Sequence, residues 1–300
     1  MELWIPITIA AAFFQNLRFV LQKILKGQLS TLGATWSRFL YAAPLAVLFL
    51  IGMITIGGYA MPGLNGRFFA FALTGGLAQI VATSLVVYLF GLRNFAVGIT
   101  LKKTETVQAA IIGAVVLGDR VGTAGIFAII VSLVGVILLS GPSERPGLRH
   151  MFSRSALVGL AAGAIFGVSG IGYRGAALAL DGGDSFIRAA VTLAFVTTAQ
   201  TIGMFFWMQW REPGQARKVL SVWPKASLVG LTGMLGSLGW FTAMAMQNVA
   251  YVKALGQIEL VFSIAASYLF FGERISRNEW FGMALILSAI LILIGLKAPG

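Results

Sequence analysis

The sequence predicts an all-α polytopic membrane protein with ten transmembrane helices, arranged as an inverted five-plus-five repeat. Three observations predict this fold: the composition, ten apolar windows and an internal repeat. Hydrophobic residues make up 58% of the 300 residues, and charged residues make up 11%, against about 25% in an average soluble chain. So few charged side chains do not cover a water-facing surface. A soluble enzyme and a nucleic-acid-binding protein are therefore excluded, despite the net charge of +12.

Ten windows are long and apolar enough to cross a bilayer. A spanning helix needs about 20 mostly apolar residues, because the hydrocarbon core is about 30 Å thick and a helix rises 1.5 Å per residue. In chain order, the windows cover residues 3–21, 32–54, 67–90, 95–117, 121–140, 155–180, 185–208, 226–246, 249–271 and 278–297. They use most of the chain, so we expect no soluble domain.

The second half of the chain repeats the first. The segment from Asn94 to Arg120 aligns without a gap on the segment from Asn248 to Arg274, and Glu105 then aligns with Glu259. We therefore expect an N-terminal five-helix repeat over 1–143 and a C-terminal one over 153–300. Because five is odd, the second copy enters the membrane upside down. Many secondary transporters have this architecture and bind substrate between the halves near the bilayer midplane.

Two short signatures follow the fourth and ninth windows, Gly118-Asp119-Arg120 and Gly272-Glu273-Arg274, and Ser37-Arg38-Phe39 lies in the second window. With these motifs the whole chain resembles the EamA-type drug/metabolite transporter superfamily, and it is similar to the YddG-type exporters of aromatic amino acids. The resemblance implies export of amino acids, metabolites or drugs. The family often carries a proline in the fourth and ninth helices, whereas this chain has Lys102, Lys103 and Glu105 in the fourth.

Two glutamates are expected near the bilayer midplane, Glu105 and Glu259. An ionisable group there costs about 2.5–3.5 kcal/mol on insertion scales, so it should face a partner or a wet cavity. Lys102 precedes Glu105 by one turn, on the same helix face, whereas Glu259 has no basic residue within one turn. We hypothesise that Glu259 carries a proton and that Lys102 or Lys103 holds a negative group of the substrate. The alternative is that both glutamates are structural.

Other polar residues inside the windows are expected to line a central cavity, although each also fits an interhelical hydrogen bond. These candidates for substrate binding are Asn16, Gln79, Thr83, Tyr173, Ser237, Trp240 and Gln257. Basic residues a few positions from the window ends are expected to extend to the lipid headgroups instead. They are Arg18, Arg38, Arg174, Arg188 and Lys253.

The residue types in the chain give little support to a catalytic, metal or cofactor site. The chain has no cysteine and a single histidine, His150, which excludes thiol chemistry and a multi-histidine metal site. We expect no cofactor. The leading function is a secondary active transporter in a bacterial inner membrane, which exports amino acids or related small metabolites by alternating access with proton coupling. The excess of cations inside the windows suggests a substrate with an anionic group. The alternatives are a membrane-embedded enzyme acting on a lipid-linked substrate and a non-transporting scaffold.

The distribution of lysine and arginine predicts the orientation. Most of those outside the windows lie in the connections after the first, third, fifth, seventh and ninth windows, and only Arg67, Arg120 and Lys297 lie on the opposite side. The positive-inside rule then places both chain ends outside the cytoplasm, whereas the family resemblance implies ends inside.

Overall fold

The computed structural model describes residues 2–89, 92, 101–139, 153–271 and 277–295. Within these residues the regular structure is α-helical, apart from one isolated β-bridge between Gly63 and Asp181. Six of the helices are long and apolar enough to cross a membrane. The prediction of an all-α membrane protein is therefore confirmed at this level.

The helices follow most of the predicted windows closely. Their bounds are α1 (Trp4–Lys26), α2 (Thr31–Thr55), α3 (Gly66–Leu89), α5 (Glu105–Leu117), α6 (Thr123–Leu139), α8 (Arg154–Ala179), α9 (Ser185–Arg211), α10 (Gln215–Ser221), α11 (Trp223–Met246), α12 (Val249–Leu255), α13 (Ile258–Phe271) and α14 (Arg277–Gly295). The signature from Gly272 to Arg274, the connection around His150 and the start of the window at 95–117 lie outside the described residues.

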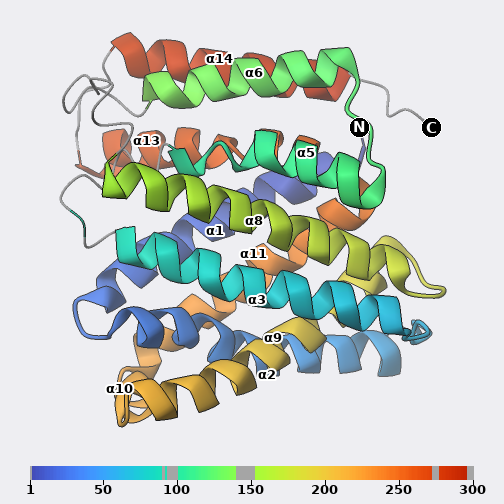
Figure 1. The fold of residues 1–300 in the computed structure, drawn as a ribbon, viewed down its shortest axis with the longest axis vertical. Helices are drawn as coiled ribbons and strands as arrows, with labels where there is room; N and C mark the ends of the chain where they lie inside the picture. Colours follow the sequence, from blue (N-terminus) through green and yellow to red (C-terminus); the bar gives the residue numbers. More distant parts are fainter. Residues whose placement is uncertain (1, 90–91, 93–100, 140–152, 272–276, 296–300) are drawn as a thin grey trace.

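The long helices lie roughly parallel in one bundle (Figure 1). The pair α6 and α14 forms one edge, and α2 and α9 lie together at the other, next to the short helix α10. Between these edges α3 packs along α8, and α1 packs along α11. Each of these pairs joins a helix of the first half to one of the second half. The helices of residues 1–143 therefore pack directly against those of residues 153–300.

The window at 249–271 was expected as one continuous helix, and this prediction is wrong. Gly256 and Gln257 form a turn that separates α12 from α13, and α5 begins at Glu105 directly after a turn at Lys103 and Thr104. Neither break contains a proline. Backbone hydrogen bonds three residues apart carry the chain through both turns, such as Gln257 N to Ala254 O (3.2 Å) and Thr104 N to Leu101 O (3.1 Å). This 3₁₀ geometry satisfies the backbone without water.

Glycines allow the central helices to approach closely. A Cβ atom added to Gly172 of α8 would lie 2.6 Å from the Cα of Gly75 in α3, and one added to Gly239 of α11 would lie 2.9 Å from the Cβ of Ala11 in α1. Close packing of this kind holds membrane helices together, because lipid supplies no hydrophobic drive between them. The helices around the centre of the molecule are thus fixed at short separations.

Candidate functional site

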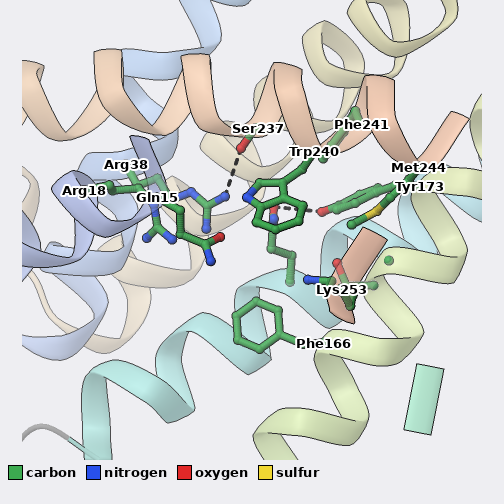
Figure 2. Close-up of a pocket in the computed structure, with 13 residues that line it drawn as sticks. Gln15, Arg18, Arg38, Phe166, Tyr173, Ser237, Trp240, Phe241, Met244 and Lys253 are labelled. Atoms are coloured by element: carbon green, nitrogen blue, oxygen red, sulfur yellow. Dashed lines mark hydrogen bonds between the residues drawn. The ribbon is translucent and has the colours of Figure 1, made fainter. Parts of the chain in front are cut away.

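A small cavity lies where the two halves meet (Figure 2). Arg18 of α1, Arg38 of α2 and Gln79 of α3 line it from the first half, and α8, α11 and α12 line it from the second. Its volume is about 30 Å³, which has room for about two water molecules. A metabolite therefore requires the surrounding helices to move apart.

Four of the predicted site residues line this cavity, namely Gln79, Tyr173, Ser237 and Trp240. The others do not line it. Six of these are buried in the protein around it, and Asn16 is partly buried on α1; the full set is Asn16, Thr83, Lys102, Lys103, Glu105, Gln257 and Glu259.

Arg18 and Arg38 do not extend to the headgroups, so that expectation is wrong. Their side chains are 3% and 5% exposed and line the cavity. Arg38 donates to Ser237 Oγ at 3.0 Å and to Thr83 Oγ1 at 3.5 Å, and Arg18 donates to Gln22 Oε1. Among the described residues, no carboxylate pairs with either guanidinium. Both arginines are therefore buried, and the hydrogen-bond partners given above are neutral.

A cluster of lysines and glutamates lies beside the cavity at the two helix breaks. Lys102 Nζ lies 3.0 Å from Glu105 Oε2, and Lys253 Nζ lies 3.5 Å from Glu105 Oε1. Lys103 forms an ion pair with Glu259. Glu259 has no basic residue within one turn of its own helix, and its cation, Lys103, comes from the other half of the chain. Lys253, which is expected at the headgroups, is instead partly buried, with its side chain 11% exposed, and it lines the cavity.

The pairing within this cluster is reciprocal between the halves. Lys103 of the first half pairs with Glu259 of the second, and Lys253 of the second pairs with Glu105 of the first. A further contact joins Gln257 Nε2 to Thr106 Oγ1 at 3.1 Å. These contacts connect α5 to α12 and α13 near the breaks, so they link the two halves of the chain directly.

Aromatic rings lie against two of the lysines in the cluster, and one of these, Lys253, also lines the cavity. Lys253 Nζ lies 5.1 Å from the ring centroid of Trp240 and 5.8 Å from that of Phe166, and Lys102 Nζ lies 4.8 Å from Phe166. A cation over an aromatic face is stabilised by the ring quadrupole. The lysines thus have both carboxylate and aromatic partners.

A hydrogen-bonded group forms another part of the wall. The Tyr173 hydroxyl donates to Gln79 Oε1 at 2.8 Å, Gln200 Nε2 donates to the same oxygen at 3.0 Å, and the ring of Tyr173 packs against Phe241 with centroids 4.1 Å apart. The sequence analysis missed Gln200. An amide within the apolar window 185–208 was the signal that could have found it.

Further contacts join the two halves on the side of the bundle where α1 begins and α14 ends (Figure 1). Arg174 of α8 pairs with Asp119 at 3.1 Å and donates to the carbonyls of Met244 and Gln247. The expectation that Arg174 extends to the headgroups is therefore wrong. On the same side, the backbones of Gly63 and Asp181 exchange hydrogen bonds.

These features define an integral multi-pass membrane protein with a buried, charged cavity between packed helices. Residues 153–295 match the EamA-like transporter family. The chain is 31% identical over 86 residues to the "Probable 4-amino-4-deoxy-L-arabinose-phosphoundecaprenol flippase subunit ArnE" of Pseudomonas fluorescens strain Pf-5, a match that covers 28% of this chain and 74% of that protein. The protein belongs to the EamA-like transporter family.

The fold also resembles a solved structure. A crystal structure described only as that of a protein matches with a TM-score of 0.74 at 15% identity, over 99% of each chain. At this identity the likeness concerns the fold alone.

Proposed function

We propose that the protein is a secondary active transporter that carries a small metabolite by alternating access between two inverted halves, residues 1–143 and 153–300. The observation that carries this proposal is the cavity itself. It lies between the halves, and its lining mixes charged, amide and aromatic side chains, as metabolite sites do. A scaffold has no need to bury charge at such a place.

The helix pairs support an inverted repeat. If α1 and α3 are taken as equivalent to α8 and α11, the contact of α1 with α11 maps onto that of α8 with α3, and both contacts occur. The pairs α2 with α9 and α6 with α14 map onto themselves. The two helix breaks, at Glu105 and next to Glu259, fall at aligned positions of the repeat. This is the relation expected from a two-fold axis in the membrane plane.

The substrate site is assigned to the cavity. Gln79, Tyr173, Ser237 and Trp240 are proposed to contact the substrate when the cavity opens, because they line it already. The lysines Lys102 and Lys103, together with Glu105, are proposed to set the local charge rather than to bind the substrate directly, since each is occupied by an ion pair. Asn16, Thr83 and Gln257 do not line the cavity and are proposed to support the residues that do.

Proton coupling is assigned to Glu259. Protonation of this carboxylate would remove its ion pair with Lys103, and with it a contact between the halves. Loosening that contact when a proton binds would link the proton to the conformational change. We expect Glu259→Gln to exchange labelled substrate across proteoliposomes while losing acceleration by an imposed pH gradient. Unchanged acceleration would remove Glu259 from the coupling step.

The class of function is tested by flux. Purified protein in proteoliposomes should accumulate at least one compound from a panel of amino acids, oxo acids and phosphorylated metabolites above empty liposomes. The family resemblance implies export across a bacterial inner membrane, so inside-out vesicles should take the substrate up. Absence of flux for every compound, with no thermal stabilisation by any of them, would favour a scaffold.

The similarity to a flippase subunit raises a second candidate, namely translocation of a lipid-linked substrate. Fluorescent or isotope-labelled polyprenyl phosphate in one leaflet distinguishes the two. A flippase would equalise the label between leaflets, whereas a metabolite transporter would leave it in place and carry the soluble compounds.

A further inference from the structure

We propose that the cavity binds an organic oxyanion that carries no ammonium group, held by Arg18, Arg38 and the indole N–H of Trp240. This inference rests on the proposed function, because it names the class of substrate for the same cavity. Of the amino acids and related metabolites that the family resemblance implies, it keeps only the related metabolites that carry no amine.

The first step is the distribution of charge. In the cluster beside the cavity, three lysines face two glutamates, and each of Lys102, Lys103 and Lys253 has a carboxylate partner. Arg18 and Arg38 have no carboxylate partner among the described residues. A buried cation that is not compensated by the protein is costly. An anionic ligand supplies the missing charge.

The second step is the position of the two arginines. A Cβ atom added to Gly233 of α11 would lie 3.2 Å from Cδ of Arg18 and 3.2 Å from Cγ of Arg38. The lack of a side chain at Gly233 therefore allows both stems to pack at one place. Figure 2 shows the two side chains together on one side of the cavity, next to Gln15. Two guanidinium groups held close together present a fork-like set of donors that suits an oxyanion.

The third step is an unused donor. Trp240 is 7% exposed and lines the cavity, and its Nε1 has no hydrogen-bond partner among the described residues. In Figure 2 the indole nitrogen is turned toward the side where Arg38 and Ser237 lie. A buried N–H without an acceptor is rare in proteins and costs free energy. An oxygen of a bound anion would accept from it.

The fourth step excludes an ammonium group. Of the described residues that line the cavity, three are cationic, namely Arg18, Arg38 and Lys253, and none is acidic. The two carboxylates behind the lining are already engaged, since Glu105 pairs with Lys102 and Lys253, and Glu259 pairs with Lys103 and accepts from Gln15. The α-ammonium of an amino acid would therefore enter a positive site whose nearby carboxylates are held by lysines. The rings of Phe166, Tyr173 and Phe241 form part of the wall and suit an apolar or aromatic body.

The proposal is tested by binding of matched compounds to the purified full-length protein in detergent. Phenylpyruvate and phenylalanine share a carboxylate and a phenyl ring, but only phenylalanine carries an ammonium group. We expect phenylpyruvate to raise the apparent melting temperature and to bind at least about tenfold more tightly, which corresponds to about 1.4 kcal/mol. Phenyl phosphate distinguishes a phosphate from a carboxylate as the preferred oxyanion. Equal binding of phenylalanine would overturn the proposal.

Substitutions at the three proposed donors test where the anion binds in the cavity. Arg38→Gln and Arg18→Gln should each weaken binding of the oxyanion by about tenfold or more, and Trp240→Phe should weaken it while keeping the aromatic wall. Arg154→Gln is the matched control, because Arg154 is exposed at the start of α8 and packs over Tyr88. If an arginine variant is not monodisperse, Arg38→Lys and Trp240→Phe provide the measurement. Full binding by the folded arginine and tryptophan variants would overturn the proposal.

The failure of this inference is distinguishable from the failure of transport. Flux of an amino acid that is unaffected by Arg38→Gln would leave the transporter assignment intact and remove the anion site. Binding of the oxyanion that depends on Arg38, without flux of any compound, would keep the site and remove the transporter assignment.

Discussion

Glu105 is the residue on which the charge balance beside the cavity depends most directly. Its two carboxylate oxygens face Lys102 and Lys253, and its side chain is 5% exposed. Removing one partner of a buried ion pair is more damaging than never having had the pair, because the remaining charge stays buried. Without the Glu105 carboxylate, Lys102 and Lys253 would both lose an ion pair and would keep the aromatic rings beside them.

Glu105→Gln is therefore expected to destabilise the protein by about 3–5 kcal/mol, measured by unfolding in a mixed detergent. The substitution keeps the size of the side chain, so the loss reports charge. Lys218→Gln, which removes an exposed charge in α10, should leave stability nearly unchanged. Combining Glu105→Gln with Lys253→Met should recover part of the loss, because fewer lysines are then unpaired. A stable single variant would contradict the assigned pairing.

At the scale of the elements, the contact between α3 and α8 depends on glycine. Gly172 in α8 faces Gly75 in α3, and a Cβ atom at Gly172 would meet the Cα and N of Gly75 at 2.6 and 2.8 Å. Backbone atoms cannot move aside as a flexible side chain can. The two helices must therefore separate to accept even a methyl group at this position.

Gly172→Ala is expected to cost about 1–3 kcal/mol, the usual range for overpacking. The matched control is Gly203→Ala, since Gly203 lies exposed in α9 and an added Cβ would meet nothing within 4 Å. The control should be neutral or slightly stabilising, because alanine has the higher helix propensity. The measurement is the shift in thermal unfolding of each purified variant. Equal shifts would show that the close approach of α3 and α8 is not limiting.

At the scale of the whole molecule, the pair of Arg174 and Asp119 joins the two halves on the side where α1 begins. The proposed alternating access would require this contact to break while contacts on the other side form. The pair also lies among buried backbone contacts, since Arg174 donates to Met244 O at 2.8 Å. Weakening it should shift the population toward states that are open on this side.

Asp119→Asn is therefore expected to increase access to the cavity from that side. A Ser169→Cys reporter, in the cavity wall, should react with a small maleimide about tenfold faster when Asp119→Asn is also present, equivalent to about 1.4 kcal/mol. The chain has no other cysteine to interfere. Replacing Asp184, an exposed acid on the same side that caps α9, should not change the rate. An unchanged rate in Asp119→Asn would exclude this pair as a contact that limits access.

The orientation of the whole molecule in the membrane is tested by the same chemistry. The distribution of lysine and arginine predicts that α10 faces the cytoplasm. Gly66→Cys, at the start of α3, should react with an impermeant maleimide in intact cells, whereas Ser221→Cys in α10 should react only after permeabilisation. The reverse pattern would support the orientation that the family resemblance implies.

The sequence by itself determined that this is a helical membrane protein, because apolar length and sparse charge are local properties of the chain. It also located Gln79, Tyr173, Ser237 and Trp240, which are polar or isolated aromatic side chains in apolar windows and do line the cavity. Only the tertiary structure decided the partners of the charges. Lys103 meets Glu259 across the two halves, and no local spacing reports such a contact.

The arginines and the helix breaks show the same physical limit. A position such as Arg38, a few residues inside a helix, is compatible with a side chain that reaches the headgroups or one that turns inward, and packing against α11 decides for the cavity. The breaks at Lys103 and Gly256 occur without proline. Local helix propensity therefore does not predict these breaks, which depend on packing against the surrounding helices. Sequence determines which side chains enter the membrane, whereas tertiary packing determines which of them meet and which remain for a substrate.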